Sequence, residues 1–175
     1  MAAGSTYTPI QTTTLGSAQA SYTFSSISQS YTDLVLISNY AGSVNDVGFF
    51  IRVGNGSVDT GTNYSRTSLN GNGTTAASTR ESSQTAISLA YNYGNSTTLD
   101  KPNFQITNLM NYSNATTYKS ILIRSRGTRD NDATDTTAMV GLWRNTSAIN
   151  TIQIYPASGN ILTGSTFTLY GISAA

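Results

Sequence analysis

Apolar and polar residues alternate with a period of two along several short stretches of this chain. In residues 20–27, Tyr22 and Phe24 alternate with Ser and Thr, and residues 47–53 and 84–93 alternate in the same way. Side chains with this spacing point to opposite faces of a β-strand, so the pattern predicts strands that bury one face. No window has the 3.6-residue period of an amphipathic helix, and we expect helix only as single turns.

The predicted strands recur about every ten to fifteen residues, separated by clusters of Gly, Asn, Asp and Ser. This rhythm is typical of an all-β protein, and it predicts a single-domain antiparallel β-sandwich of the jelly-roll type over residues 1–175. About nine to eleven strands are expected. They cover residues 7–15, 20–27, 31–40, 47–53, 64–69, 84–93, 101–109, 117–125, 137–144, 149–155 and 166–172.

Two segments are expected to depart from this regular framework. Residues 1–15 form a candidate N-terminal arm, and residues 54–79 form a loop excursion rich in Gly, Asn and Thr that holds one short strand at most. A loop of this length inside a compact domain is usually functional or disordered. Because Arg and Tyr are enriched where protein interfaces are strongest, the candidate interface residues of this excursion are Tyr64, Arg66 and Leu69.

The run at residues 137–144 is apolar on both sides of a predicted strand. Met139, Gly141 and Trp143 share one face of it, and Val140 and Leu142 share the other. At least one face of such a strand must be buried. We therefore expect Trp143 to be a core residue rather than a platform for a ligand.

The residues that most often carry catalytic chemistry are scarce. The chain has no Cys and no His, its single Glu is Glu81, and charged residues make up 10% of it, whereas about three residues in ten are Ser or Thr. His, Cys, paired carboxylates and Lys do most acid, base and nucleophilic work near neutral pH. The composition therefore predicts a non-enzymatic protein that binds no cofactor.

One short segment concentrates charge of both signs. Asp130, Asp132 and Asp135 could together bind Ca²⁺, but an EF-hand loop has Gly where Asp135 lies and a Glu six residues later, and both are missing. The alternative is a solvated turn in which the carboxylates pair with nearby arginines. The same arginines form the main basic cluster of the chain and are candidate interface residues: Arg124, Arg126 and Arg129.

Charge and hydropathy restrict the partners that we expect. The net charge is +1 and the isoelectric point is about 7.9, which gives no basic footprint for nucleic acid. The chain begins without a secretory signal pattern and contains no apolar run of membrane-spanning length, so we expect synthesis in a reducing cytoplasm and no membrane partner. So few charges protect a free monomer poorly, and we expect an oligomer, with a homotrimer favoured.

Five stretches of the chain carry a family resemblance, namely residues 1–10, 50–56, 59–64, 142–149 and 164–172. Together they resemble small virion proteins of tailed bacteriophages, especially marine and cyanobacterial ones. The resemblance implies a jelly roll on the particle surface, most often a homotrimeric decoration or cement subunit bound to the major capsid protein or other virion proteins. Its alternative is a tail or head fibre domain that contacts host glycans, and a glycan-processing enzyme is a third candidate. The resemblance carries no catalytic residue.

Overall fold

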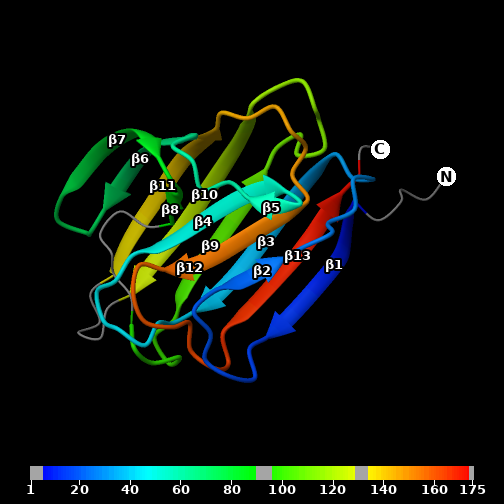
Figure 1. The fold of residues 1–175 in the computed structure, drawn as a ribbon. Coiled ribbons are helices and arrows are strands. Elements are labelled where there is room, and N and C mark those ends of the chain that lie inside the picture. Colours follow the sequence, from blue (N-terminus) through cyan, green and yellow to red (C-terminus); the bar gives the residue numbers. More distant parts are fainter. Residues whose placement is uncertain (1–5, 90–95, 129–133, 174–175) are drawn as a thin grey trace.

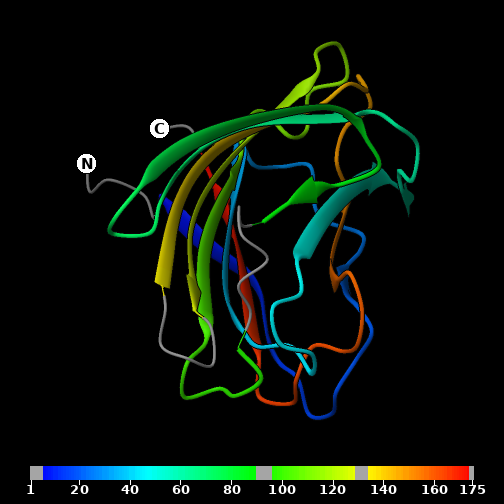
Figure 2. The ribbon, with the colours of Figure 1, turned by 90° about the vertical axis from the view of Figure 1, so that its left-hand side faces the viewer.

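The computed structural model describes residues 6–89, 96–128 and 134–173 of the chain. These residues form thirteen strands and no helix, and therefore none that could cross a membrane. The strands make two antiparallel sheets that pack face to face (Figure 1, Figure 2). The sequence prediction of an all-β antiparallel sandwich is confirmed.

The larger sheet has eight strands in the order β1-β13-β3-β9-β10-β11-β6-β7. At one edge of this sheet the first strand pairs with the last, which brings together segments that are far apart in the sequence. The strands are β1 (Tyr7–Thr14), β13 (Thr166–Ile172), β3 (Asp33–Tyr40), β9 (Asn103–Leu109), β10 (Lys119–Thr128), β11 (Thr134–Trp143), β6 (Tyr64–Gly71) and β7 (Ala76–Gln84).

The smaller sheet lies in front of the larger one in Figure 1 and covers one of its faces, which we call the inner face. Its strand order is β2-β12-β4-β5, and β8 pairs with β4. The strands are β2 (Tyr22–Phe24), β12 (Thr151–Pro156), β4 (Phe49–Asn55), β5 (Ser57–Val58) and β8 (Ile87–Ser88).

The hydrophobic core fills the space between the sheets. From β4, Phe49, Ile51 and Val53 are all buried, as their alternation predicts. They meet inward-facing residues of the larger sheet, and the buried apolar side chains form one cluster. That cluster includes Leu34, Leu36, Ile121, Ile123, Met139, Trp143, Ile152, Ile154, Phe167 and Leu169.

Trp143 is buried, with 1% of its surface exposed, which confirms its predicted place in the core. Its indole Nε1 donates a hydrogen bond of 2.8 Å to Asp59 Oδ2, so the polar atom of the ring is also satisfied. On the same face, Gly141 leaves room for β8. A Cβ atom at this position would lie 2.5 Å from Cδ1 of Ile87, too close for real contact, so the glycine allows Ile87 to pack there.

The structure corrects two of the segment boundaries that the sequence suggests. Residues 54–79 are not a loop excursion: they contain β5, all of β6 and the start of β7. Residues 7–14 are not a free arm but the edge strand β1, paired with β13. Since β6 pairs with both β11 and β7, deleting residues 55–73 would disrupt the larger sheet.

The expected strand at residues 84–93 is found only in part, and its residues 90–93 lie outside the described residues. Strand β7 ends at Gln84, Ile87 and Ser88 form β8 against β4, and Leu89 N donates a hydrogen bond to Phe49 O. Only the last residue of β7, Gln84, falls within a predicted strand. Most side chains of β7 face water, so its sequence, AASTRESSQ, shows no alternation of apolar and polar residues that would have predicted a strand.

Candidate docking surface

The outer face of the eight-stranded sheet points away from the smaller sheet. Over β9, β10, β11, β6 and β7 it consists of every second side chain of each strand, and the register aligns them in three rows across the sheet. The first row is Asn108, Leu122, Val140, Thr67 and Arg80; the second is Ile106, Arg124, Ala138, Leu69 and Ser78; the third is Phe104, Arg126, Thr136, Gly71 and Ala76.

Large apolar side chains lie uncovered on this outer face. Leu69 is 65% exposed and Val140 is 53% exposed, while Phe104 and Leu122 are exposed at 42% and 39%. Leu122 pairs directly with Val140 across β10 and β11, so the exposed groups are neighbours rather than scattered single residues. A contiguous exposed apolar patch on a folded protein commonly marks an interaction surface.

Two shallow hollows lie side by side on the outer face. One has a volume of about 390 Å³ and includes Leu69, Leu122 and Val140 in its lining. The other has a volume of about 330 Å³ and includes Phe104. Arg124 and Ala138 line both hollows and so separate them. The arrangement is an uneven surface with two apolar recesses and a cation between them.

The structure places two of the three sequence-predicted arginines on this face. Arg124 and Arg126 are exposed and lie on the outer face, and Arg129 lies outside the described residues. Arg124 and Arg126 do not pair with Asp135, which has the opposite phase in its strand, next to Thr136 of the outer face. The described residues contain one ion pair, and it lies elsewhere, on the inner face.

Tyr64 is not an interface anchor, contrary to the sequence-based expectation. Its side chain is fully buried, and its hydroxyl accepts a 3.1 Å hydrogen bond from Val53 N and lies 2.9 Å from Val53 O. Burial raises the pKa of this phenol above its ordinary value. Tyr64 alternates in phase with the buried positions of β6, which sequence reasoning missed because it treated the segment as a loop.

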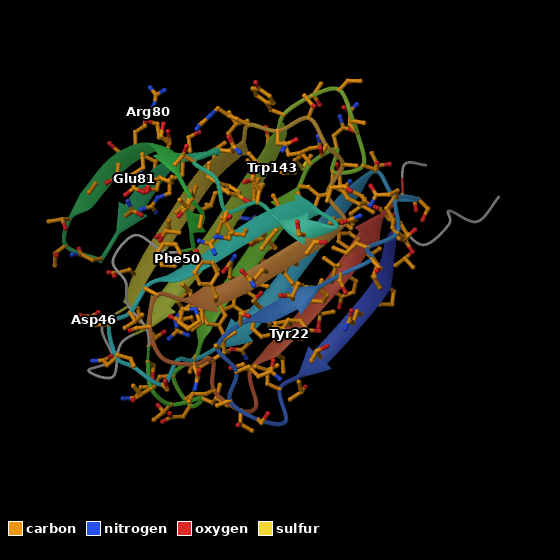
Figure 3. The ribbon with its side chains drawn as sticks, in the orientation of Figure 1. Tyr22, Asp46, Phe50, Arg80, Glu81 and Trp143 are labelled. Atoms are coloured by element: carbon orange, nitrogen blue, oxygen red, sulfur yellow. The ribbon has the colours of Figure 1, made fainter. Side chains whose placement is uncertain are left out.

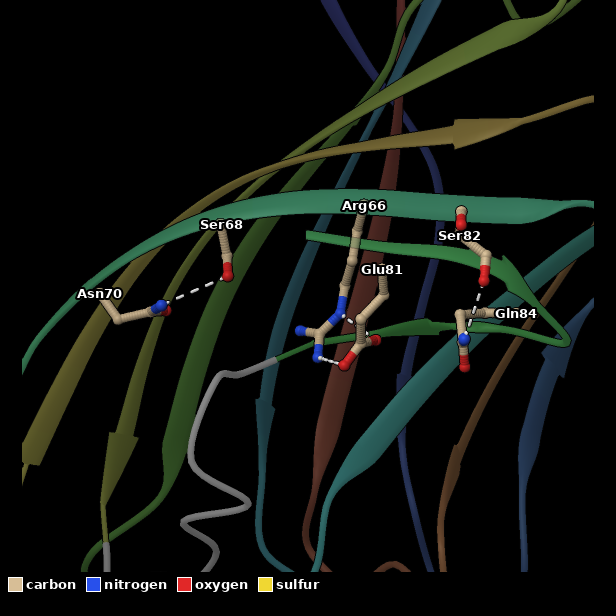
Figure 4. A network of polar contacts seen from close by, with 6 residues as sticks. All are labelled: Arg66, Ser68, Asn70, Glu81, Ser82 and Gln84. Atoms are coloured by element: carbon tan, nitrogen blue, oxygen red, sulfur yellow. Dashed lines mark hydrogen bonds and ion pairs between the residues drawn. The ribbon is translucent and has the colours of Figure 1, made fainter. Parts of the chain in front are cut away.

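Arg66 is not an interface anchor either. It is 5% exposed, and it forms a bidentate ion pair with Glu81 of β7 (Figure 4). Arg66 Nε lies 2.8 Å from Glu81 Oε2, and Arg66 Nη2 lies 3.0 Å from Glu81 Oε1. The hydrogen bonds from Arg66 hold the pKa of Glu81 below its usual value. The pair fastens β7 to β6 from the inner side, so only Leu69 of the three predicted residues is available on the surface.

A third hollow, of about 200 Å³, is polar and lies beside Asp59 and Trp143. The carboxylate of Asp59 is engaged there, because it accepts 2.8 Å hydrogen bonds from Trp143 Nε1, Asn63 Nδ2 and Gly61 N. Burial opposes ionisation of this group, but the hydrogen bonds outweigh it and lower its pKa. A carboxylate held ionised in this way links β11 to the β5–β6 turn, and it is unsuited to acid catalysis near neutral pH.

The described residues contain no group of three side chains arranged to hold a metal ion. Of the three aspartates considered for Ca²⁺, only Asp135 lies within the described residues.

Sequence reasoning also missed the outer-face residues Arg80, Leu122 and Val140. A usable signal was present, because the runs at residues 121–123 and 139–143 are apolar at consecutive positions, and a sheet covered on one side cannot bury both faces.

No protein-family model matches the chain. No curated protein matches it in a sequence search. The fold and the outer face are therefore interpreted from their own geometry and chemistry.

Proposed function

We propose that this protein is a non-enzymatic structural subunit of a bacteriophage particle, a decoration or cement protein that attaches to the outer surface of the capsid. The outer face of the eight-stranded sheet is the attachment surface. Association buries its apolar side chains against the shell, which adds contact area between subunits and resists the outward pressure of the packaged DNA.

The observation that supports this proposal most directly is the exposed apolar centre of the outer face. Leu69, Leu122 and Val140 gather on adjacent strands and line one hollow. Covering such side chains with another protein is favourable by about 25 cal/mol per Å² of apolar area removed from water. An exposed apolar surface of this kind is compatible with a subunit that functions within a large assembly, because the assembly covers it.

The condition of the ionisable groups fits a structural role as well. Glu81 is paired with Arg66, and Asp59 is held by several donors. Lys119 is fully buried, and its Nζ donates to the carbonyl oxygens of Thr117 and Thr146 at 2.5 and 3.0 Å. Burial lowers the pKa of Lys119. Each of these groups connects strands or loops of the sandwich.

Localisation and copy number test the proposal. Antibodies raised against the purified chain would be applied to particles released from infected cells, and labelled particles would be counted by electron microscopy alongside quantitative mass spectrometry. We expect hundreds of copies per particle distributed over the head. Absence of the chain from purified particles would overturn the proposal, and a handful of copies at the tail would favour the fibre alternative.

A further inference from the structure

The three rows of the outer face carry positive charge and contain no negative charge of their own. Its three rows over β9, β10, β11, β6 and β7 contain fifteen residues, and none of them is Asp or Glu. Three of them are arginines: Arg80, Arg124 and Arg126. All three are exposed, and none of them shares in the single ion pair found among the described residues.

The spacing of these arginines follows from the register of the strands. Arg124 and Arg126 are two residues apart on β10, which separates their Cα atoms by roughly 7 Å. Arg80 lies on β7, three strands away in the order β10-β11-β6-β7, at roughly 14 Å across the sheet. It points away from the sandwich, whereas its neighbour Glu81 turns inward (Figure 3). The arginines thus bracket the apolar hollow that contains Leu69 and Val140.

Arg124 would be covered by any partner that fills the hollows, because it lines both of them. Covering a guanidinium group is unfavourable unless the partner supplies an acceptor that restores its hydrogen bonds and charge. A carboxylate fits best, since its two oxygens match the fork of the guanidinium group. The chemistry of the face therefore requires acidic residues on whatever covers the apolar centre.

A second copy of the same face does not meet this requirement. Two copies related by a two-fold axis would bring three arginines from each side together around a common apolar centre. Neither copy has a carboxylate in these rows to neutralise them, and like charges facing each other across an interface disfavour the complex. Face-to-face pairing of this chain with itself is thereby disfavoured.

We propose that the outer face binds a different protein whose contact surface combines an apolar centre with Asp or Glu side chains. Two of these carboxylates, roughly 7 Å apart, oppose Arg124 and Arg126, and a third faces Arg80. This inference rests on the proposed function in one respect, namely that the capsid shell supplies the acidic surface. It identifies which chemical groups of the shell the subunit recognises.

The experiment compares two variants of equal net charge in binding to phage particles that lack this chain, prepared by deleting its gene. In Arg124→Gln/Arg126→Gln, two charges are removed from the outer face. In Thr23→Glu/Ser158→Glu, two negative charges are added at exposed positions outside the larger sheet. Both variants lower the net charge by two, so a difference between them reports the location of the charge rather than its total.

We expect the outer-face variant to bind particles at least ten-fold more weakly than the wild type, and the control variant to bind within about two-fold of it. Wild-type binding should also weaken as NaCl is raised, and the salt dependence should be smaller for the arginine variant. Urea unfolding of both variants checks that they remain folded. Equal binding by the two variants would overturn the proposal of an acidic partner.

Two further outcomes separate this inference from the function on which it rests. If the wild-type chain does not bind particles at all, the proposed function fails, and the partner chemistry fails with it. If the wild type binds and removing the arginines has no effect, only the inference fails. Stronger binding to vesicles of anionic phospholipid or to duplex DNA than to the particles would overturn it as well, because phosphate rather than carboxylate would then be the preferred ligand.

Discussion

Both faces of β10 and β11 carry large apolar side chains, but the two faces have different surroundings. On the inner face, Ile121, Ile123 and Met139 are covered by the smaller sheet and are at most 3% exposed. On the outer face, Leu122 and Val140 alternate with them and remain open to solvent. A sheet with one wet face normally places polar side chains on it. The difference indicates that the inner apolar set serves folding, whereas the outer set is available for association.

The same contrast holds for charged residues on neighbouring strands. On the inner side, Arg66 is nearly buried and has a carboxylate partner in Glu81. On the outer side, Arg124 and Arg126 are exposed and unpaired among the described residues. Inner substitutions should therefore change the free energy of unfolding, and outer substitutions should change binding. Three of the four predictions below pair an inner position with an outer one.

Trp143→Ala should produce the largest loss of stability. Trp143 is among the largest fully buried side chains, and its removal leaves a cavity and an unfilled hydrogen-bond position at Asp59, so we expect a cost of about 3–5 kcal/mol. Val140→Ala, on the opposite face of the same strand, should change stability by about 0.5 kcal/mol or less. Urea unfolding measures both, and equal losses would contradict the difference between the faces.

Gly141→Ala should produce the next largest loss. The added methyl group would meet Cδ1 of Ile87 at 2.5 Å, and such overpacking typically costs about 1–3 kcal/mol. Combining it with Ile87→Val, which deletes that same Cδ1 atom, should recover part of the loss in a double-mutant cycle. A strictly additive cycle would show that the contact with Ile87 is not the cause.

The sequence predicted the sandwich and its core better than its surfaces. Trp143 and the alternation in β4 could be placed because burial leaves a periodic apolar signal. Strand β7 gave no such signal, since its stability comes from pairing with β6 and from the Arg66–Glu81 contact, which depend on residues distant in sequence. Tyr64 was placed in a short strand within a loop excursion for a related reason: the glycines and asparagines around it resemble turns, so the buried face of β6 was not recognised.

The docking surface could not be predicted from the sequence for a different reason. Apolar runs such as Ile121–Ile123 were interpreted as strands, but periodicity cannot say which face another sheet will cover. That assignment depends on where β4, β8 and β12 lie. The candidates Arg124, Arg126 and Leu69 belong to this surface, while Leu122 and Val140 become recognisable only from the register.

Glu81→Gln should cost roughly 1–2 kcal/mol at neutral pH, less than breaking a fully buried pair, because Glu81 is partly exposed. Arg66 lowers the pKa of Glu81 in the folded state relative to its ordinary 4.5. A lowered carboxylate pKa stabilises the fold above that value, and the contribution is lost as the pH falls through the folded pKa.

The wild-type urea midpoint should therefore fall as the pH is lowered from about 5 to 3, and Glu81→Gln should make this fall shallower. Part of the fall should remain in the variant, because the pKa of Asp59 is lowered too and that residue is unchanged. Arg80→Gln is the matched outer-face control from the next position in β7, and it should leave both the neutral stability and the pH profile unchanged. A flattened profile in Arg80→Gln would contradict the assignment of the ion pair to the inner face.

Leu122→Thr/Val140→Thr should have the smallest effect on stability, about 0.5 kcal/mol or less per residue, because both side chains are exposed and Thr is also favourable in strands. The corresponding inner-face variant Met139→Thr should be clearly destabilised, since it buries a hydroxyl group in the core. The outer variant should nevertheless bind gene-deleted phage particles more weakly than the wild type. A variant that loses stability but keeps its binding would reverse the roles of the two faces, and urea unfolding together with particle co-sedimentation decides between these outcomes.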